Sequence, residues 1–210
     1  MAERQYEKDV FVNCPLDTDY RPLLQAIVFT IHDCGFAARS ALEVTDTSQI
    51  RIEKISAIIA ACKFGLHDIS RTDLDRDTGL PRFNMPLELG LFLGAKRFGI
   101  GKQKAKNCLV LDVDRYRYQK FISDIAGQDI VAHGGTVVQA IRVVRDWLSD
   151  AGGAAEKLPG GAAMMLRYQI FRYDLPGMSM RRGVDPEEMT FNEYVLRVEE
   201  WLAVQARLPV

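Results

Sequence analysis

The first 150 residues of the chain alternate between short β-rich runs and longer segments with helical periodicity. The runs that read as strands are, in order, "DVFVNCP", "FAARSAL", "KFGLHDIS", "CLVLDVD" and "DIVAH". Helical segments of about 12–16 residues separate them. This alternation predicts an α/β fold with a doubly wound parallel sheet covered by helices on both faces. With five strands, the flavodoxin-like order 2-1-3-4-5 is the leading topology.

The composition changes after residue 152. The stretch "GGAAEKLPGGA" has the composition of a linker, and "TFNEYVLRVEEWLAVQ" is an amphipathic helix that opens with a Thr190–Glu193 capping box. We therefore divide the chain into an α/β domain (residues 1–152) and a C-terminal helical extension (residues 153–210). The extension is expected to pack on the α/β core or on a partner subunit.

Charge and composition exclude several classes of protein. Lys plus Arg number 27 and Asp plus Glu 28, so the basic excess typical of a nucleic-acid binder is missing. The alternating Arg and Tyr of "RYRYQKF" (115–121) are explained as well by a helix face with snorkelling side chains. The start has no apolar stretch behind a basic leader, and no window approaches the roughly 20 apolar residues of a membrane span. We expect a cytoplasmic protein with neither nucleic acid nor a membrane as partner.

The cysteines and histidines give no sign of a metal site. The four cysteines are widely separated and form no C-x-x-C pair, and none of the three histidines is spaced as a ligand pair. We expect reduced cysteines, no metal and no cofactor.

The topology predicts where a ligand would bind. In an open α/β sheet, ligands bind outside the carboxyl ends of the strands where the strand order reverses, which here is between strands 1 and 3. The residues expected there are Asn13, Cys14 and Asp17 after strand 1, and Asp68, Ser70 and Arg71 after strand 3.

Glu88 is the one charged residue between Met85 and Ala95, in a helix that is otherwise apolar or small. Pro86 suits a first helical turn, so Glu88 is expected within a turn of the helix N-terminus and at the rim of the same crevice. An acid there can merely complement the helix dipole, worth a few tenths to about 1 kcal/mol, or it can perform chemistry at the mouth of a dry crevice.

Two internal glycines in the same helix need an explanation. Gly90 and Gly94 each cost about 1 kcal/mol relative to Ala in a helix interior. Such glycines usually let a helix approach another backbone closely, which would be the sheet or a second subunit. A homo-oligomer is therefore an expected form of the protein.

At these positions the chain resembles known families. "DVFVNCP" (9–15) resembles the opening strand of TIR domains. "HDIS" (67–70), then a polar loop, then "FNMPLELGLFLGAKRFG" (83–99) resembles nucleoside 2-deoxyribosyltransferases and the related TIR-like nucleotide-binding proteins. In those families an Asp ends the third strand, and a helix starting Glu-Leu-Gly or Glu-Ile-Gly follows a variable loop. The resemblance covers roughly residues 8–150 and leaves out the C-terminal extension.

The resemblance implies cleavage of an N-glycosidic bond in a nucleotide, a nucleoside or NAD. The family glutamate maps onto Glu88, as nucleophile or stabiliser of the cation. The family aspartate maps onto Asp68, which would bind ribose hydroxyls or protonate the leaving base. Ser70, Arg71 and Asn84 would orient the sugar or a phosphate.

The chain also departs from the deoxyribosyltransferase pattern. The first loop reads "NCPLD" in place of a glycine-containing turn, and "RFNMP" precedes Glu88. These differences favour hydrolysis of NAD or a nucleotide, or binding without turnover, over base exchange on deoxynucleosides. An N-glycosidase is the leading hypothesis. The alternative is a catalytically silent, TIR-like nucleotide-binding or assembly module whose extension mediates oligomerisation.

Overall fold

The structure, a computed structural model, describes residues 5–72, 74, 79–153 and 158–207. It contains a five-stranded parallel sheet of order β2-β1-β3-β4-β5. The strands are β1 (Asp9–Asn13), β2 (Ala37–Arg39), β3 (Phe64–Asp68), β4 (Asn107–Asp112) and β5 (Val131–Ala132). The α/β, flavodoxin-like fold predicted from the sequence is confirmed.

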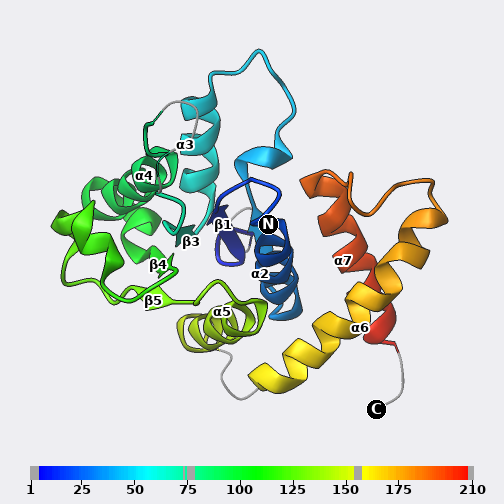
Figure 1. Cartoon of the computed structure of the whole chain (residues 1–210). Helices are drawn as coiled ribbons and strands as arrows, with labels where there is room; N and C mark the ends of the chain where they lie inside the picture. Colours follow the sequence, from blue (N-terminus) through cyan, green and yellow to red (C-terminus); the bar gives the residue numbers. More distant parts are fainter. Residues whose placement is uncertain (1–4, 73, 75–78, 154–157, 208–210) are drawn as a thin grey trace.

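Helices cover both faces of this sheet (Figure 1). They are α2 (Arg21–Asp33), α3 (Arg51–Ala61), α4 (Asn84–Phe98), α5 (Val137–Ala151), α6 (Gly161–Met180) and α7 (Phe191–Gln205), with short 3-10 turns η1 (Ala41–Glu43), η2 (Gly101–Ala105), η3 (Arg117–Lys120) and η4 (Ser123–Ile125). Helices α2 and α5 pack together on one face of the sheet, and α3 and α4 pack together on the other. None of the described helices is long and apolar enough to cross a bilayer.

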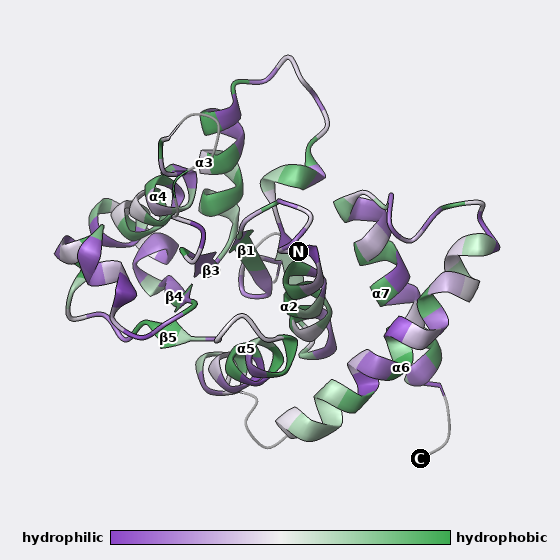
Figure 2. Ribbon diagram, in the orientation of Figure 1, coloured by the Kyte–Doolittle hydropathy of each residue, from purple (hydrophilic) through white to green (hydrophobic). Residues whose placement is uncertain are grey.

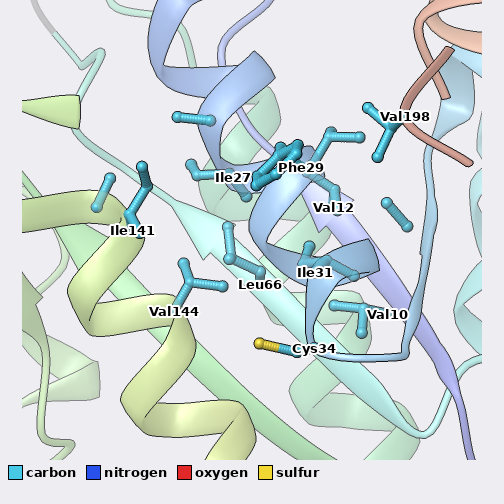
Figure 3. Close-up of a cluster of buried hydrophobic side chains, with 14 of the residues drawn as sticks. Val10, Val12, Ile27, Phe29, Ile31, Cys34, Leu66, Ile141, Val144 and Val198 are labelled. Atoms are coloured by element: carbon cyan, nitrogen blue, oxygen red, sulfur yellow. The ribbon is translucent and has the colours of Figure 1, made fainter. Parts of the chain in front are cut away.

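Successive side chains of the central strands contribute to hydrophobic clusters on opposite faces of the sheet. Val10 and Val12 of β1 belong to the cluster under α2 and α5, whereas Phe11 joins the cluster under α3 and α4. This follows from the two-residue period of a strand, which sends successive side chains to opposite faces. Figure 3 shows the first cluster, in which Leu66 of β3 lies among side chains of α2 and α5.

The C-terminal helices complete the same cluster instead of forming a separate one. The ring of Phe29 on α2 lies 5.1 Å from the ring of Phe171 on α6 and 5.8 Å from that of Trp201 on α7, centroid to centroid. Helix α2 is thereby covered by the sheet on one side and by α6 and α7 on the other. This position accounts for the many hydrophobic residues of α2, whose ribbon is mostly green in Figure 2.

The C-terminal extension was expected to pack either on the α/β core or on a partner subunit, and in the structure it packs on the α/β core. The predicted linker includes residues 154–157, which lie outside the described residues. The apolar core itself is continuous from α5 to α6 and α7.

Three helices have a cap pattern in the sequence, namely Thr190 with Glu193, Thr136 with Gln139 and Asp46 with Gln49, and the structure shows the first two caps but not the third. Thr136 caps α5, and Thr190 with Glu193 forms the capping box of α7. Asp46 does not cap α3, because its carboxylate accepts the N–H of Ser48 within a turn and the helix begins later, at Arg51. The aspartate forms a local turn in preference to a helix cap, a competition common for this residue type.

The two glycines of α4 do not approach the sheet. A Cβ atom added at Gly90 or Gly94 would meet no atom within 4 Å in the part of the chain that the structure describes. One of the two explanations expected from the sequence, close packing on the sheet, is therefore wrong. The second, contact with another subunit, stays a prediction.

Gly65, in the middle of β3, is the glycine that packing does require. A Cβ atom there would lie 2.7 Å from Nε2 of His67 and 2.7 Å from the ring of Phe92. We expect Gly65→Ala to lower the free energy of unfolding by about 1–3 kcal/mol, the usual cost of overpacking a core.

Gly90→Ala is the matched control, and it should raise the free energy of unfolding by up to about 1 kcal/mol, because alanine is the better helix former. Urea denaturation of both variants measures the difference. Equal effects of the two substitutions would contradict the packing described for β3.

Candidate functional site

Two cavities open at the carboxyl edge of the sheet, on opposite faces. The first, which we call the Glu88 cavity, has a volume of about 310 Å³ and is lined by residues from β1, the segment after β2, α3 and α4. The second, the His133 cavity, has about 400 Å³ and is lined by the start of α2 and the segments after β3, β4 and β5. The polar residues that line the Glu88 cavity are Asn13, Cys14, Ser40, Arg51, Arg82, Asn84 and Glu88.

Glu88 faces its cavity from α4. It is the fifth residue of α4, 7% exposed, and forms no hydrogen bond or ion pair with any residue that the structure describes. Burial raises the pKa of its carboxyl group, and the charge of Arg51 acts in the opposite direction. Because dipole effects fade beyond the first helical turn, this position does not fit the capping interpretation.

The apolar residues around Glu88 hold α4 against the sheet. Leu89 and Phe92 are fully buried, and Met85 is nearly so. The main-chain carbonyl of Met85 accepts a hydrogen bond of 2.9 Å from Nδ2 of Asn13 at the end of β1. This bond ties the first turn of α4 to the strand edge, so Asn13 and Glu88 line the same cavity in a fixed relation.

Asn13 also lies 3.1 Å from Nδ1 of His67 on β3. Burial lowers the pKa of His67 to about 3, so the ring is neutral and its Nδ1 accepts the amide proton. Asn13, predicted to bind substrate, is thus largely committed to holding the wall of the cavity.

Asp68 has a different environment from Glu88. Its side chain is fully buried on the α2 and α5 side of the sheet, where Oδ2 accepts the hydroxyl proton of Tyr20 and Oδ1 accepts the N–H of Ser70 at 2.8 Å. Nε2 of His133 lies 3.0 Å from Oδ2, at an angle short of a regular hydrogen bond.

The tautomer of His133 is fixed from its other side. The N–H of Gly135 donates to Nδ1 of His133 at 3.0 Å, so in the neutral ring the proton is on Nε2 and faces Asp68. With these donors around it, Asp68 connects the starts of α2 and α5 to the end of β3. The sequence placed Asp68 and Glu88 in one crevice, and the structure places them at one edge but on opposite faces of the sheet.

The other predicted site residues divide between the two faces. Asn84 lines the Glu88 cavity, and Ser70 and Arg71 line the His133 cavity. Cys14 also lines the Glu88 cavity, but its side chain belongs to the cluster under α2 and α5, beside Tyr20 and Asp68. Asp17 accepts the N–H of Tyr20 at 3.0 Å and a guanidinium N–H of Arg71 at 3.1 Å, so it organises the start of α2. The structure therefore brings Asn13, Cys14, Asn84 and Glu88 together and leaves Asp17, Asp68, Ser70 and Arg71 outside that group.

Sequence reasoning missed part of the lining. Ser40 follows β2 and Arg51 begins α3, and both face the Glu88 cavity. Strand order alone could have found Ser40, because β2 neighbours β1 and its carboxyl end must reach the same edge. On the other face, Tyr20 and His133 had no sequence signal, since they meet Asp68 only through the tertiary fold.

The "RYRYQKF" segment is structural. Arg117 donates to the buried carboxylate of Asp112 at 2.8 Å and to the carbonyls of Ile69 and Ser70 at 3.0 and 2.8 Å. Tyr118 is buried in the cluster under α4. These contacts join β4 to the segment after β3, so Arg117 and Tyr118 have structural roles, whereas Arg115, Tyr116 and Lys120 are exposed.

Among the described residues, no group of three or more His, Cys, Asp or Glu side chains could hold a metal ion. Comparisons of the chain with protein-family models, with curated proteins and with solved structures find no significant match. The resemblance to TIR-like proteins and deoxyribosyltransferases therefore stays a prediction.

The raised pKa of Glu88 predicts how stability depends on pH. The folded state holds the Glu88 proton more tightly than the unfolded chain, so stability falls as the pH rises from 4.5 through the folded-state pKa. Glu88→Gln, which cannot ionise, should raise the melting temperature at neutral pH and lose that advantage near about pH 4.

Glu188→Gln, at an exposed position, is the control and should change the melting temperature little at either pH. Thermal unfolding followed by circular dichroism measures all three proteins. A Glu88→Gln variant that is less stable than the native protein at neutral pH would show that the carboxylate has a stabilising partner.

Proposed function

We propose that this protein cleaves an N-glycosidic bond of a nucleotide, a nucleoside or NAD, with Glu88 acting at the anomeric carbon. One observation carries the proposal. Glu88 is a desolvated carboxylate that faces a cavity and has no partner among the described residues. At the same edge, protein donors hold both oxygens of Asp68 and one oxygen of Asp112, which unlike Glu88 is paired with an arginine, Arg117.

The chemistry requires a carboxylate of this kind. When the bond between C1′ and the base nitrogen breaks, its electron pair leaves with the base, which takes up a proton, and positive charge develops on the sugar. A desolvated carboxylate stabilises that charge strongly because little water screens it. Its oxygen can also bond to C1′, and water then attacks C1′, returns the carboxylate and gives up a proton.

The remaining lining can bind a sugar. Asn84 stands at the start of α4, and Ser40 follows β2, so the two side chains offer donors and acceptors for ribose hydroxyls beside Glu88. The ribose-binding role expected for Asp68 is not part of this proposal, because protein donors already occupy both of its oxygens. The resemblance to deoxyribosyltransferases, which maps the family glutamate onto Glu88, supports the same reaction.

Chromatography tests the proposal directly. The purified protein is incubated with ribo- and deoxynucleosides, their 5′-monophosphates, NAD and NADP, and released base is measured. We expect release by the native protein and by the exposed control Glu188→Gln, and at least about 100-fold slower release by Glu88→Gln.

Equal release by the native protein and Glu88→Gln would overturn the proposal. If no compound is cleaved while one of them raises the melting temperature, the silent nucleotide-binding module expected as the alternative is supported instead.

Assembly is a second candidate function, favoured by the outward face of α4. Phe83, Leu87, Gly90, Gly94 and Phe98 are spaced so that they share one side of the helix. Phe83, Leu87 and Phe98 are 63%, 56% and 85% exposed, and an added Cβ atom at either glycine would meet no described atom within 4 Å. A second copy of the chain could bury this face and recover the stability that the glycines cost.

Sedimentation velocity over a roughly hundredfold range of concentration tests this candidate. We expect self-association of the native protein and its loss in Leu87→Lys, with the exposed Leu166→Lys on α6 as control. A native protein that stays monomeric throughout that range would exclude assembly through this face.

A further inference from the structure

We infer that the substrate of the Glu88 cavity is a mononucleotide whose phosphate group binds Arg51. This inference rests on the proposed function and names the substrate class within it. Three features support it: the positive charge of Arg51 beside Glu88, the uncapped start of α3 and the volume of the cavity.

The cavity contains a cationic side chain that the described protein does not neutralise. Arg51 forms no hydrogen bond or ion pair with any described residue, although its charge acts on Glu88. The guanidinium and the carboxylate are therefore close enough to interact electrostatically but are not in contact. A ligand between them would place an electron-poor carbon near Glu88 and an anion near Arg51.

The backbone beside Arg51 reinforces this preference. Arg51 is the first residue of α3, and the N-cap, Ile50, has a side chain that cannot accept a hydrogen bond from the first turn. The free N–H groups of an uncapped helix start favour an anion nearby, in addition to the charge of the arginine.

The anion that binds Arg51 is expected to be a phosphate or a carboxylate. The planar guanidinium group binds either of them through two parallel hydrogen bonds. Substrates with an N-glycosidic bond to a base carry phosphate far more commonly than carboxylate. A phosphate on the sugar is also attached to the ring that Glu88 must reach, so one molecule satisfies both groups.

The volume of the cavity favours a ligand with one nucleotide unit over a ligand with two. About 310 Å³ is at the lower limit of the 300–1,000 Å³ typical of small-molecule sites. A dinucleotide such as NAD has two nucleotide units, and only one of them could be enclosed here. The cavity therefore favours a nucleoside 5′-monophosphate over both an uncharged nucleoside and NAD.

The experiment combines turnover with binding. Base release is compared for nucleosides, the matching 5′-monophosphates and NAD, using the native protein, Arg51→Gln and the exposed control Arg181→Gln. For the native protein and the control we expect kcat/KM to be 10- to 100-fold higher for the best monophosphate than for its nucleoside. In Arg51→Gln we expect kcat/KM for the monophosphate to fall 10- to 100-fold more than kcat/KM for the nucleoside, so that the preference is lost.

Calorimetry provides a readout that needs no turnover. The same monophosphates are titrated into Glu88→Gln and into the double variant Glu88→Gln with Arg51→Gln, and binding should weaken 10- to 100-fold in the double variant. Loss of nucleoside and monophosphate activity in equal measure, no preference for the monophosphate, or NAD as the best substrate would each overturn the inference.

The two proposals fail in distinguishable ways. Glu88-dependent release without any phosphate preference overturns the inference and leaves the proposed function standing. Monophosphate binding that depends on Arg51, with no base released from any compound, overturns the proposed function and supports the ligand class. Neither binding nor release would overturn both.

Discussion

The buried carboxylate of Asp68 holds the carboxyl edge of the sheet together. It accepts protons from Tyr20 at the start of α2 and from the backbone after β3, and it contacts His133 just before α5. Losing one partner of a buried charge typically costs about 3–5 kcal/mol, so this cluster fixes where α2 and α5 begin. Because the carboxylate is occupied in this way, the chemistry that we propose at this edge is assigned to a different acid, Glu88.

Glu88 and Asp68 lie on opposite faces of the sheet because of the direction of successive side chains along β3. Successive residues point to opposite faces, so Asp68 faces α2 and α5 while His67 faces α4 and accepts a proton from Asn13. Asn13 in turn holds the first turn of α4, and with it the cavity in which Glu88 lies. Asp68 thus organises the edge, whereas Glu88 is buried on the opposite face without a hydrogen-bond or ion-pair partner among the described residues. The cost of that desolvation is the reason to seek a function for it.

The sequence predicted the fold and four of the residues that line the Glu88 cavity, namely Asn13, Cys14, Asn84 and Glu88. Strand order, the caps of α5 and α7 and the position of Glu88 in an apolar helix follow from local periodicity and turn chemistry, which the chain carries residue by residue. The sequence does not show which side chains of β3 face α2 and α5 and which face α3 and α4. That is decided only when these helices pack on the sheet, so the face on which Asp68 lies could not be predicted. The pairing with Tyr20 and His133, 48 and 65 residues away, exists only once those helices have docked. Arg51 was missed for a simpler reason, since the site was sought only after strands 1 and 3.

The most direct measurement of the central claim is carbon-13 NMR of the side-chain carboxyl groups, assigned with Glu88→Gln and followed while a nucleoside 5′-monophosphate is added. If Glu88 faces the ligand and Asp68 is occupied by the protein, the Glu88 resonance moves with the titration and the Asp68 resonance stays in place. A moving Asp68 resonance beside an unchanged Glu88 resonance would contradict the account and return the site to the other face of the sheet.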